Sequence, residues 1–343
     1  MRITAVTCVK NEGPFLLEWI AYHRLIGVTD FLFYSNDCSD GTDHLLNALA
    51  QRGGVTHLPN PAEGRNYQME ALKAARQQAV VRDADWVLIT DVDEFLNIHV
   101  GNHRIPDLIQ ACDTPHAISL SFQFFANAGV ETYVDQPVIS QFSHSHNPDI
   151  WCAETAIEVK TLIHRDFPLR YYGAHRPFLR KDLSADQLPD WRDGSGRRVP
   201  HKFLTAANSR RIRKFPARGA REFATLNHYA LRSLDSYLVK NDRGDVNREN
   251  RQFDDSYWRE RNDTAFEDRS IQHHLPALTA ALDVLKSDPE IGALHTACVD
   301  AHRDRCSALM QHAEFQAMRL QLQNTPPLTA AEAALIAELD LAP

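Results

Sequence analysis

The first ninety residues alternate between short apolar runs and longer stretches with helical periodicity. Short runs rich in β-branched side chains predict strands, and apolar residues that recur every three or four positions predict helices. The predicted strands cover residues 2–9, 29–35, 55–58 and 85–90, and the predicted helices cover residues 15–26, 43–52 and 67–81. Pro14 suits the first turn of the first helix, and Gly27 ends it. This order predicts a parallel sheet wrapped by helices, which binds ligands beyond the carboxyl ends of its strands.

The chain after residue 90 is less regular. A further β segment is expected at residues 116–125, and helical periodicity returns near the end of the chain. The helices expected there cover residues 275–285, 289–320 and 330–339. We therefore expect an α/β domain over residues 1–270 and a mostly helical extension over residues 271–343. The pattern leaves open whether this extension caps the domain, forms a dimer contact or binds a membrane-associated partner.

Composition agrees with this organisation. The 343 residues are 43% apolar, enough for one large α/β domain with an appendage or for two modest domains. No long apolar span or signal peptide is evident, and the six cysteines show no Cys-x-x-Cys spacing. Scattered cysteines indicate buried free thiols in a reducing compartment rather than disulfides or a zinc site. We expect a soluble, cytoplasmic protein.

The run from Leu88 to Phe95 ends an apolar strand in three carboxylates within four positions. Because strand residues alternate between faces, Asp91 and Asp93 are expected to project to one side while Val92 turns into the core. Two neighbouring carboxylates at the carboxyl end of a strand suit Mg²⁺ or Mn²⁺ that carries a substrate phosphate. A solvated loop is the alternative for an isolated Asp-x-Asp, and the α/β context favours the metal site.

Positive charge is concentrated in one stretch. Residues 160–221 contain 16 Lys or Arg against five Asp, a local balance of +11, so the remainder of a chain with net charge −8 carries −19. The stretch also contains five prolines and lacks a regular helix to enter a groove, which argues against nucleic acid. A diphosphate, an acidic glycan or a lipid phosphate surface is at least as good a partner. A solvated loop region is the alternative.

Several ordered blocks of residues resemble glycosyltransferases of the group related to families 2 and 92. The blocks are Val9–Glu12, Glu18–His23, Tyr34–Gly41, Asp91–Phe95, Lys160–Ile163, Gly173–Pro177 and Asn227–Ser233, followed by Tyr237, Lys240 and Arg243. The resemblance spans about residues 1–270 and includes an Asp-x-Asp-Glu-Phe motif. It implies a GT-A fold, which is a Rossmann-like mixed sheet flanked by helices. It also implies a nucleotide-sugar donor and a divalent cation, Mn²⁺ or Mg²⁺.

The resemblance assigns roles to residues near the strand ends. Asp91 and Asp93 are expected to anchor the cation, and His228 matches the histidine that completes the site in many GT-A enzymes. The nucleotide is expected across the ends of the first strands, with uridine favoured over guanosine. The expected donor-binding residues are Thr7, Asn11, Glu12, Asn36, Asp37, Asp40, Arg65, Gln68, Asp91, Lys240 and Arg243.

Simpler structural roles remain open for several of these residues. A turn with a helix cap accounts for Asp40, and a surface charge accounts for Arg65. A solvated helix face accounts for Lys240 and Arg243, and a lone histidine such as His228 is more often a packed or surface residue.

The resemblance suggests inversion of configuration, which needs one general base near the acceptor hydroxyl. The candidates are Asp149, Glu154 and Glu158, with Glu154 preferred, although one exposed strand edge would also account for Glu154 and Glu158. Glu94 adjoins the metal pair and is expected to orient the water of the ion or a neighbouring group.

These residues together predict a metal-dependent glycosyltransferase. It would move a sugar from a UDP-linked donor to a glycan, glycolipid or protein acceptor in polysaccharide biosynthesis. A peripheral membrane contact through residues 160–221 and a homodimer are further expectations. The alternatives are a catalytically silent glycan- or nucleotide-binding module and an Asp-x-Asp phosphotransferase. The pattern does not identify the donor sugar, the acceptor or the linkage.

Overall fold

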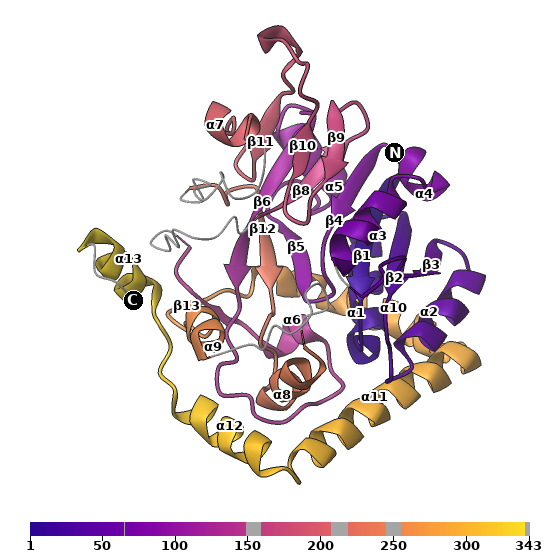
Figure 1. Ribbon diagram of the computed structural model, residues 1–343, viewed down its shortest axis with the longest axis vertical. Coiled ribbons are helices and arrows are strands. Elements are labelled where there is room, and N and C mark those ends of the chain that lie inside the picture. Colours follow the sequence, from indigo (N-terminus) through magenta and orange to yellow (C-terminus); the bar gives the residue numbers. More distant parts are fainter. Residues whose placement is uncertain (65, 149–158, 207–218, 245–254, 340–343) are drawn as a thin grey trace.

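The computed structural model describes residues 1–64, 66–148, 159–206, 219–244 and 255–339 (Figure 1). Its first part is a parallel sheet whose strands lie in the order β3-β2-β1-β4. These strands are β1 (Ile3–Val9), β2 (Asp30–Ser35), β3 (Val55–Pro59) and β4 (Trp86–Ile89). The helices that connect them are α1 (Gly13–Leu25), α2 (Thr42–Gln51), α3 (Tyr67–Ala75) and α4 (Ala79–Arg82). The strand and helix order predicted for the first ninety residues is therefore confirmed.

The second part of the sheet is mixed. Strand β8 (Val159–His164) is antiparallel to both of its neighbours, β4 and β6 (Ala117–Phe124). Beyond β6 lies β12 (Ala224–His228), which is parallel to β6 and antiparallel to the edge strand β5 (Glu94–Ile98). The mixed sheet that the family resemblance implies is therefore confirmed, because β8 reverses direction in the middle of the sheet. The fold class, a mixed α/β sheet flanked by helices with a helical carboxyl-terminal region, is confirmed.

The remaining elements surround this sheet. Those before β12 are α5 (Ile105–Ala111), α6 (Val138–Gln141), β7 (His144–Ser145), β9 (Leu169–Tyr172), β10 (Pro177–Leu179), β11 (Trp191–Asp193) and α7 (His201–Leu204). Those after it are α8 (Leu234–Arg243), α9 (Asp255–Arg261), β13 (Phe266–Glu267), α10 (Leu275–Ser287), α11 (Pro289–Leu309), α12 (Ala313–Asn324) and α13 (Ala330–Glu338). Strand β11 extends the large sheet by pairing with β6.

Two predicted helices are each divided in the structure. The helix expected at residues 67–81 is split into α3 and α4, because Gln78 has an extended backbone with ψ of 136°. The helix expected at residues 289–320 is split into α11 and α12, because His312 is also extended, with ψ of 126°. Neither break contains glycine or proline, so the apolar pattern gives no sign of it.

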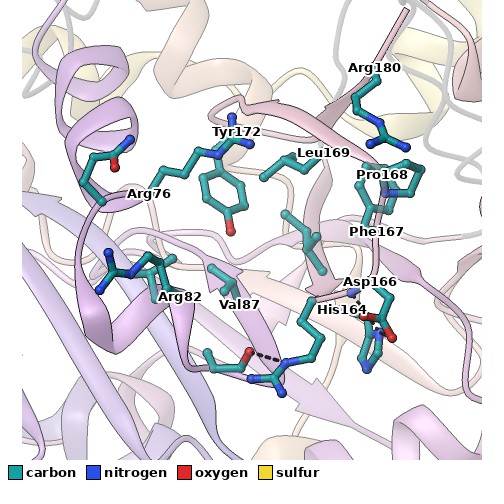
Figure 2. Close-up of a pocket in the computed structure, with 15 residues that line it drawn as sticks. Arg76, Arg82, Val87, His164, Asp166, Phe167, Pro168, Leu169, Tyr172 and Arg180 are labelled. Atoms are coloured by element: carbon teal, nitrogen blue, oxygen red, sulfur yellow. Dashed lines mark hydrogen bonds and ion pairs between the residues drawn. The ribbon is translucent and has the colours of Figure 1, made fainter. Parts of the chain in front are cut away.

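The described part of the basic stretch contains the strands β8, β9, β10 and β11, so the solvated-loop alternative is wrong for these segments. Lys160 is 1% exposed in β8, and the buried guanidinium of Arg176 lies within 5.0 Å of the ring centres of Phe178, Trp191 and Phe203. Burial lowers the pKa of Arg176 to about 9. Other cations of the stretch line a cavity beside α3 and α4 (Figure 2).

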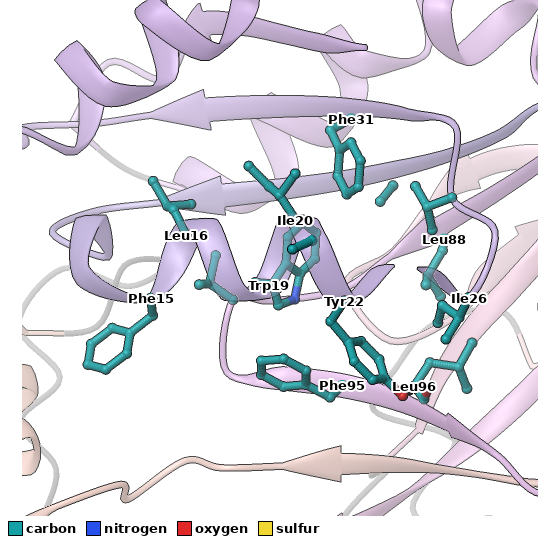
Figure 3. Close-up of a cluster of buried hydrophobic side chains, with 14 of the residues drawn as sticks. Phe15, Leu16, Trp19, Ile20, Tyr22, Ile26, Phe31, Leu88, Phe95 and Leu96 are labelled. Atoms are coloured by element: carbon teal, nitrogen blue, oxygen red, sulfur yellow. Dashed lines mark hydrogen bonds between the residues drawn. The ribbon is translucent and has the colours of Figure 1, made fainter. Parts of the chain in front are cut away.

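Helix α1 links the parallel sheet to the edge strand β5. Its apolar face packs against side chains of β2 and β4 on one side and of β5 on the other (Figure 3). The indole of Trp19 donates to the carbonyl oxygen of Glu94 at 2.9 Å, and the hydroxyl of Tyr22 donates to that of Leu96 at 2.8 Å. Since both rings are fully buried, these two bonds fix the position of β5 against the helix.

The carboxyl-terminal helices share this core. Leu278 of α10 and Cys298 of α11 belong to the same buried cluster as Trp19. A Cβ atom on Gly13 would lie 2.5 Å from the sulfur of Cys298, so the close approach of α11 to the start of α1 requires glycine. The boundary at residue 270 stays a prediction, but the helices beyond it pack directly on the sheet domain.

The five described cysteines are free, and three of them are buried, as expected. They are Cys8, Cys38, Cys112, Cys298 and Cys306, while Cys152 lies outside the described residues. Within the described residues, none of the helices combines the length and the apolar character needed to span a bilayer.

The contact of α11 with the sheet domain is expected to weaken at low pH. His302 lies against the rings of Phe15 and Tyr133, and its Nε2 atom is 3.1 Å from the hydroxyl of Ser236. Burial, aided by the nearby charge of Arg232, lowers the pKa of His302 to about 4. Between pH 6.5 and 4 the unfolded chain therefore binds a proton that the folded chain does not, and stability falls by roughly 3 kcal/mol as the pH is lowered through this range.

His302→Gln, which cannot titrate, should lose this part of the pH dependence. The measurement is the free energy of unfolding in urea at pH 7 and pH 4.5 for the wild type and the variant. His44→Gln is the control, because the side chain of His44 is 73% exposed. An unchanged difference between the two pH values in His302→Gln would contradict the assignment.

Candidate active site

The polar residues predicted from the first strands meet at one edge of the sheet. Because β1 pairs in parallel with both β2 and β4, the three carboxyl ends lie together. Asn11 and Asp40 organise the loops that follow β1 and β2. The Asn11 amide nitrogen donates to the Ser39 hydroxyl at 3.0 Å, and Asp40 accepts from the Thr42 amide at 2.9 Å and the Gly13 amide at 3.2 Å. These contacts agree with a turn role for Asp40, and its expected contact with the donor stays a prediction.

The Asp-x-Asp residues form a turn between β4 and β5 rather than a continued strand. The amide of Glu94 donates to the carbonyl oxygen of Asp91 at 3.0 Å, and Val92 is buried, as predicted. One carboxylate oxygen of Glu94 turns back and accepts from the Thr90 hydroxyl at 2.8 Å and the Asp91 amide at 3.0 Å. The turn therefore directs Asp91 and Asp93 to different cationic partners.

His228 lies beside this turn in the structure, although it is far from the turn in the sequence. In the antiparallel pairing of β12 with β5, His228 lies across from Glu94, and the amide of Tyr229 donates to the carbonyl oxygen of Asp93 at 2.8 Å. The Nε2 atom of His228 is 3.5 Å from a carboxylate oxygen of Asp93. Ligand atoms of Asp93, Glu94 and His228 lie within 4.8 Å of one another.

Two lysines complete the charges around the turn. Lys160 of β8 donates to Asp91 at 2.9 Å and lies 3.5 Å from Glu94. Lys240 of α8 donates to Asp93 and to the carbonyl oxygen of Ala230, both at 2.9 Å. Each carboxylate of the Asp-x-Asp motif therefore has its own ammonium partner.

Burial and these partners set the protonation of the acids. Burial acts to raise the pKa of Asp93, but Lys240 and His228 outweigh it and hold the pKa well below its ordinary value. Burial raises the pKa of Glu94 well above its ordinary value, despite the opposing charge of Lys160. Burial also lowers the pKa of His228, although Asp93 acts in the other direction. The turn therefore presents a charged Asp93 beside a neutral imidazole at neutral pH.

The residues present fit a divalent cation. Asp93, Glu94 and His228 offer two carboxylates and an imidazole, a donor set that Mn²⁺ accepts. Within the described residues, the buried Nδ1 atom of His228 has no hydrogen-bond partner. Asp91 lies outside this group of three, and its ammonium partner is Lys160. The assignment of the metal ligands stays a prediction.

Glu12 and Arg243 form a buried network beside the turn. The two carboxylate oxygens of Glu12 accept from Arg232, at 2.8 Å, and from Arg243. Arg243 also donates to the carbonyl oxygens of Lys10 and Asn11, and Arg232 donates to that of Val92. Burial acts to raise the pKa of Glu12, but Arg243 and Arg232 outweigh it and lower the pKa. The network joins the loop after β1 to α8.

The remaining predicted residues fall into two groups. Thr7 and Asn36 are buried at the ends of β1 and β2, Asp37 is exposed, and Gln68 is half-buried at the start of α3. The candidates Arg65, Asp149, Glu154 and Glu158 lie outside the described residues.

Sequence reasoning missed two residues of the site, Lys160 and Arg232, as partners of acids. Both stand in the blocks that carry the family resemblance, but no role followed from that position. A single lysine inside the apolar run Val159–Ile163 is the one available signal, because a central strand buries it and it then needs an anion.

The chain matches the profile of glycosyltransferase family 92 over residues 4–178, just over half of its length. It therefore belongs to glycosyltransferase family 92. A family 92 protein of Oryza sativa subsp. japonica is 32% identical over 108 residues, which cover 30% of this chain and 17% of that protein. One from Arabidopsis thaliana is 30% identical over 98 residues, which cover 27% and 16%. The matched segments thus span about a sixth of the length of these relatives.

Solved structures of low similarity include Staphylococcus aureus TarS 1–349, with a TM-score of 0.33 and 12% identity over 91% of this chain and 92% of that one. Glucosyl-3-phosphoglycerate synthase from Mycobacterium tuberculosis, in complex with Mn²⁺, UDP and glucosyl-3-phosphoglycerate, has a TM-score of 0.27 and 15% identity over 49% and 58%. Such TM-scores carry no argument about this chain, whose fold class rests on its own strand pairings.

Removal of Arg232 is expected to destabilise the protein strongly. Arg232→Met leaves Glu12 with one guanidinium partner instead of two in a buried position, at a cost of about 3 kcal/mol. The double variant Glu12→Gln/Arg232→Met should lose less than the sum of the two single variants, since the Arg232 charge that Glu12→Gln alone leaves without its carboxylate is then absent. Chemical denaturation of the four proteins measures this coupling.

The matched control for this cycle is Arg303→Met, because Arg303 pairs with Asp300 on the surface and both are more than half exposed. This change should cost no more than about 0.5 kcal/mol. Strict additivity of the Glu12 and Arg232 substitutions would contradict the network.

Proposed function

We propose that the chain is a metal-dependent glycosyltransferase that moves a sugar from a UDP-linked donor to a hydroxyl group of a glycan, glycolipid or protein acceptor. The observation that carries the proposal is the convergence of Asp93, Glu94 and His228 at the carboxyl edge of the sheet. Membership of family 92 supports the sugar-transfer chemistry. A parallel sheet with helical crossovers binds ligands at this edge, which supports the location.

Asp93 and His228, with Asp91 or Glu94, would hold Mn²⁺ or Mg²⁺. A bound cation supplies positive charge at the diphosphate oxygens as the bond between sugar and phosphate breaks. The chain adds charge of its own. Lys240 reaches Asp93 from α8, so its ammonium group lies where a diphosphate on this edge would be neutralised. Arg243 acts on the shape of the donor loop, because its guanidinium holds the carbonyl oxygens of Lys10 and Asn11.

The donor nucleotide would lie over the ends of β1 and β2. Asn11 fixes the loops there through its hydrogen bond to Ser39, and Asp40 does so through its hydrogen bond from Thr42. In the proposed mode the base and ribose meet the loop residues, and uridine is favoured. The residues assigned to this contact are Thr7, Asn11, Glu12, Asn36, Asp37, Asp40, Arg65 and Gln68.

The acceptor would be activated by one carboxylate in an inverting displacement. We assign this role to Glu154, with Asp149 as the second candidate. Glu94 is a poor base because its carboxyl group is buried and already engaged by Thr90, the Asp91 amide and Lys160. Its bonds to Thr90 and Asp91 support the role of a positioning residue instead. A cytoplasmic location, a homodimer and a peripheral membrane contact belong to the same proposal.

Asp93→Asn should lower the release of nucleotide from UDP-sugars by about 100-fold or more, because the site loses its charged carboxylate. The assay screens UDP- and GDP-sugars with Mn²⁺ for release of the nucleotide, first without acceptor. Asp113→Asn is the control, since the side chain of Asp113 is 80% exposed and away from the site. Circular dichroism checks that Asp93→Asn is folded. A folded and fully active variant would remove Asp93 from the site.

His228→Ala should shift the Mn²⁺ dependence of the same reaction to higher concentrations, because one of three ligands is lost. The measurement is the rate against Mn²⁺ concentration at fixed donor, with His44→Ala as the exposed control. An unchanged dependence of the rate on Mn²⁺ concentration would mean that His228 has only a packing role. A thermal shift that needs both Mn²⁺ and UDP, with no release of nucleotide from any donor, would instead favour a silent nucleotide-binding module.

A further inference from the structure

A second concave site lies at the other end of β4. A cavity of about 640 Å³ opens between α3 and α4 on one side and the segment from the end of β8 to β10 on the other (Figure 2). This volume falls within the range of roughly 300–1,000 Å³ that is typical of ligand pockets. Neither the Asp-x-Asp turn nor the residues of the donor loops line it.

The rim of the cavity is strongly basic. Arg76 and Arg82 lie on the side of the helices and Arg180 on the opposite side, with Tyr172 between them (Figure 2). Arg165 also lines the cavity, and Asp166 is the one carboxylate among the lining residues of the described chain. Arg165 also lies 3.4 Å from the carboxylate of Asp85, so four guanidinium groups face two carboxylates, and the remaining net positive charge selects for anions.

Two of these arginines are uncommitted. Arg76 donates to the carbonyl oxygen of Arg170 at 2.6 Å, and Arg165 donates to carbonyl oxygens of Asp83 and Ala84. Within the part of the chain that the structure describes, the guanidinium groups of Arg82 and Arg180 have no hydrogen-bond or ion-pair partner. They lie on opposite sides of the cavity (Figure 2).

The floor of the cavity is apolar. Val81, Val87, Ile163 and Phe167 are buried there, and the half-buried ring of Tyr172 points into the space (Figure 2). A free inorganic anion gains nothing from such a floor. A ligand that combines apolar faces with acidic groups uses both the floor and the rim.

The cavity is separate from the proposed site of transfer. In the antiparallel pairing of β4 and β8, His164 at the cavity lies across from Trp86, the first residue of β4. The Asp-x-Asp turn follows the last residue of β4. Val87 and Asp91 are four residues apart, which is ~13 Å along a strand.

We infer that this cavity binds an acidic oligosaccharide. The CH-rich faces of sugar rings pack on Tyr172 and the apolar floor, and carboxylate, sulfate or phosphate substituents pair with Arg82 and Arg180. A concave pocket of this kind suits a chain of sugar units better than the flat surface of a membrane. The identification of the bound oligosaccharide as part of the acceptor rests on the proposed function. The binding of the oligosaccharide does not.

The test measures binding of a hexamer of galacturonic acid to the full chain by titration calorimetry. The variant Arg82→Ala/Arg180→Ala should weaken binding at least tenfold, since each exposed guanidinium is a direct partner of a carboxylate. The matched control is Arg269→Ala/Arg303→Ala, which removes the same two charges from exposed positions outside the cavity. The control should bind as the wild type does. Maltohexaose, which has the same number of rings and no charge, should not bind measurably.

Besides a failure of the hexamer to bind, three results would overturn the inference. The first is an equal loss in the control variant, which means a general charge effect. The second is displacement of the hexamer by inorganic phosphate at an equal molar concentration, which means a simple anion site. The third is binding to phosphatidylserine vesicles that depends on Arg82 and Arg180 when the hexamer does not bind.

The binding test and the test of the proposed function can fail independently of each other. Arg82→Ala/Arg180→Ala leaves Asp93 and His228 in place, so release of nucleotide from a UDP-sugar without acceptor should be unchanged. Active nucleotide release without binding of the hexamer would reject the pocket alone. Binding of the hexamer by a chain that releases no nucleotide from any donor would reject the proposed function alone.

Discussion

The balance of buried charge around the turn between β4 and β5 constrains the rest of the structure. A carboxylate or ammonium group in the interior is stable only when an opposite charge and hydrogen bonds compensate the loss of water. The acids here are Glu12, Asp91, Asp93 and Glu94, and the cations are Lys160, Arg232, Lys240 and Arg243. Because these groups come from the loop after β1, the turn and the start of β5, β8, and the segment from Arg232 to the end of α8, satisfying them requires all of those parts to be in place together.

The same constraint explains why α1 matters to the site. The turn leads directly into β5, which pairs along one side with β12 only. Trp19 and Tyr22 donate to carbonyl oxygens of β5, so that buried acceptors on the edge strand are satisfied by side chains. Without them β5 could move, and Glu94 and Asp93 would move with it. The packing of the apolar core therefore also holds the polar site in place.

The sequence predicts the local part of this arrangement and misses the distant part. Strands such as β1 and β4 were predictable because an apolar run between turn residues has few other structures. Strand β5 was hidden, because the residues from Asp91 to Phe95 look like the end of one strand rather than the start of another. The family resemblance, not spacing, pointed to His228. Only the antiparallel pairing of β12 with β5 in the structure places His228 beside the turn.

The cationic partners of these acids could not be predicted from the sequence, for a related reason. Lys160 is 69 residues from Asp91, and Lys240 is 147 residues from Asp93. Contacts at such separations depend on strand order, and the order β4-β8-β6-β12-β5 does not follow the chain. Local periodicity carries no information about which strand is inserted between two others.

The insertion of β8 connects the charged site at the Asp-x-Asp turn with the basic cavity. This strand carries Lys160, its second residue, near the Asp-x-Asp turn and ends with His164 at the basic cavity, because it runs antiparallel to β4. Its register, with Leu162 across from Leu88, decides which face each residue takes. A slip by one residue would turn Lys160 away from Asp91 and expose Leu162 to the opposite face. One short strand therefore sets the electrostatics at both ends of β4, where the donor and the acidic chain are proposed to bind.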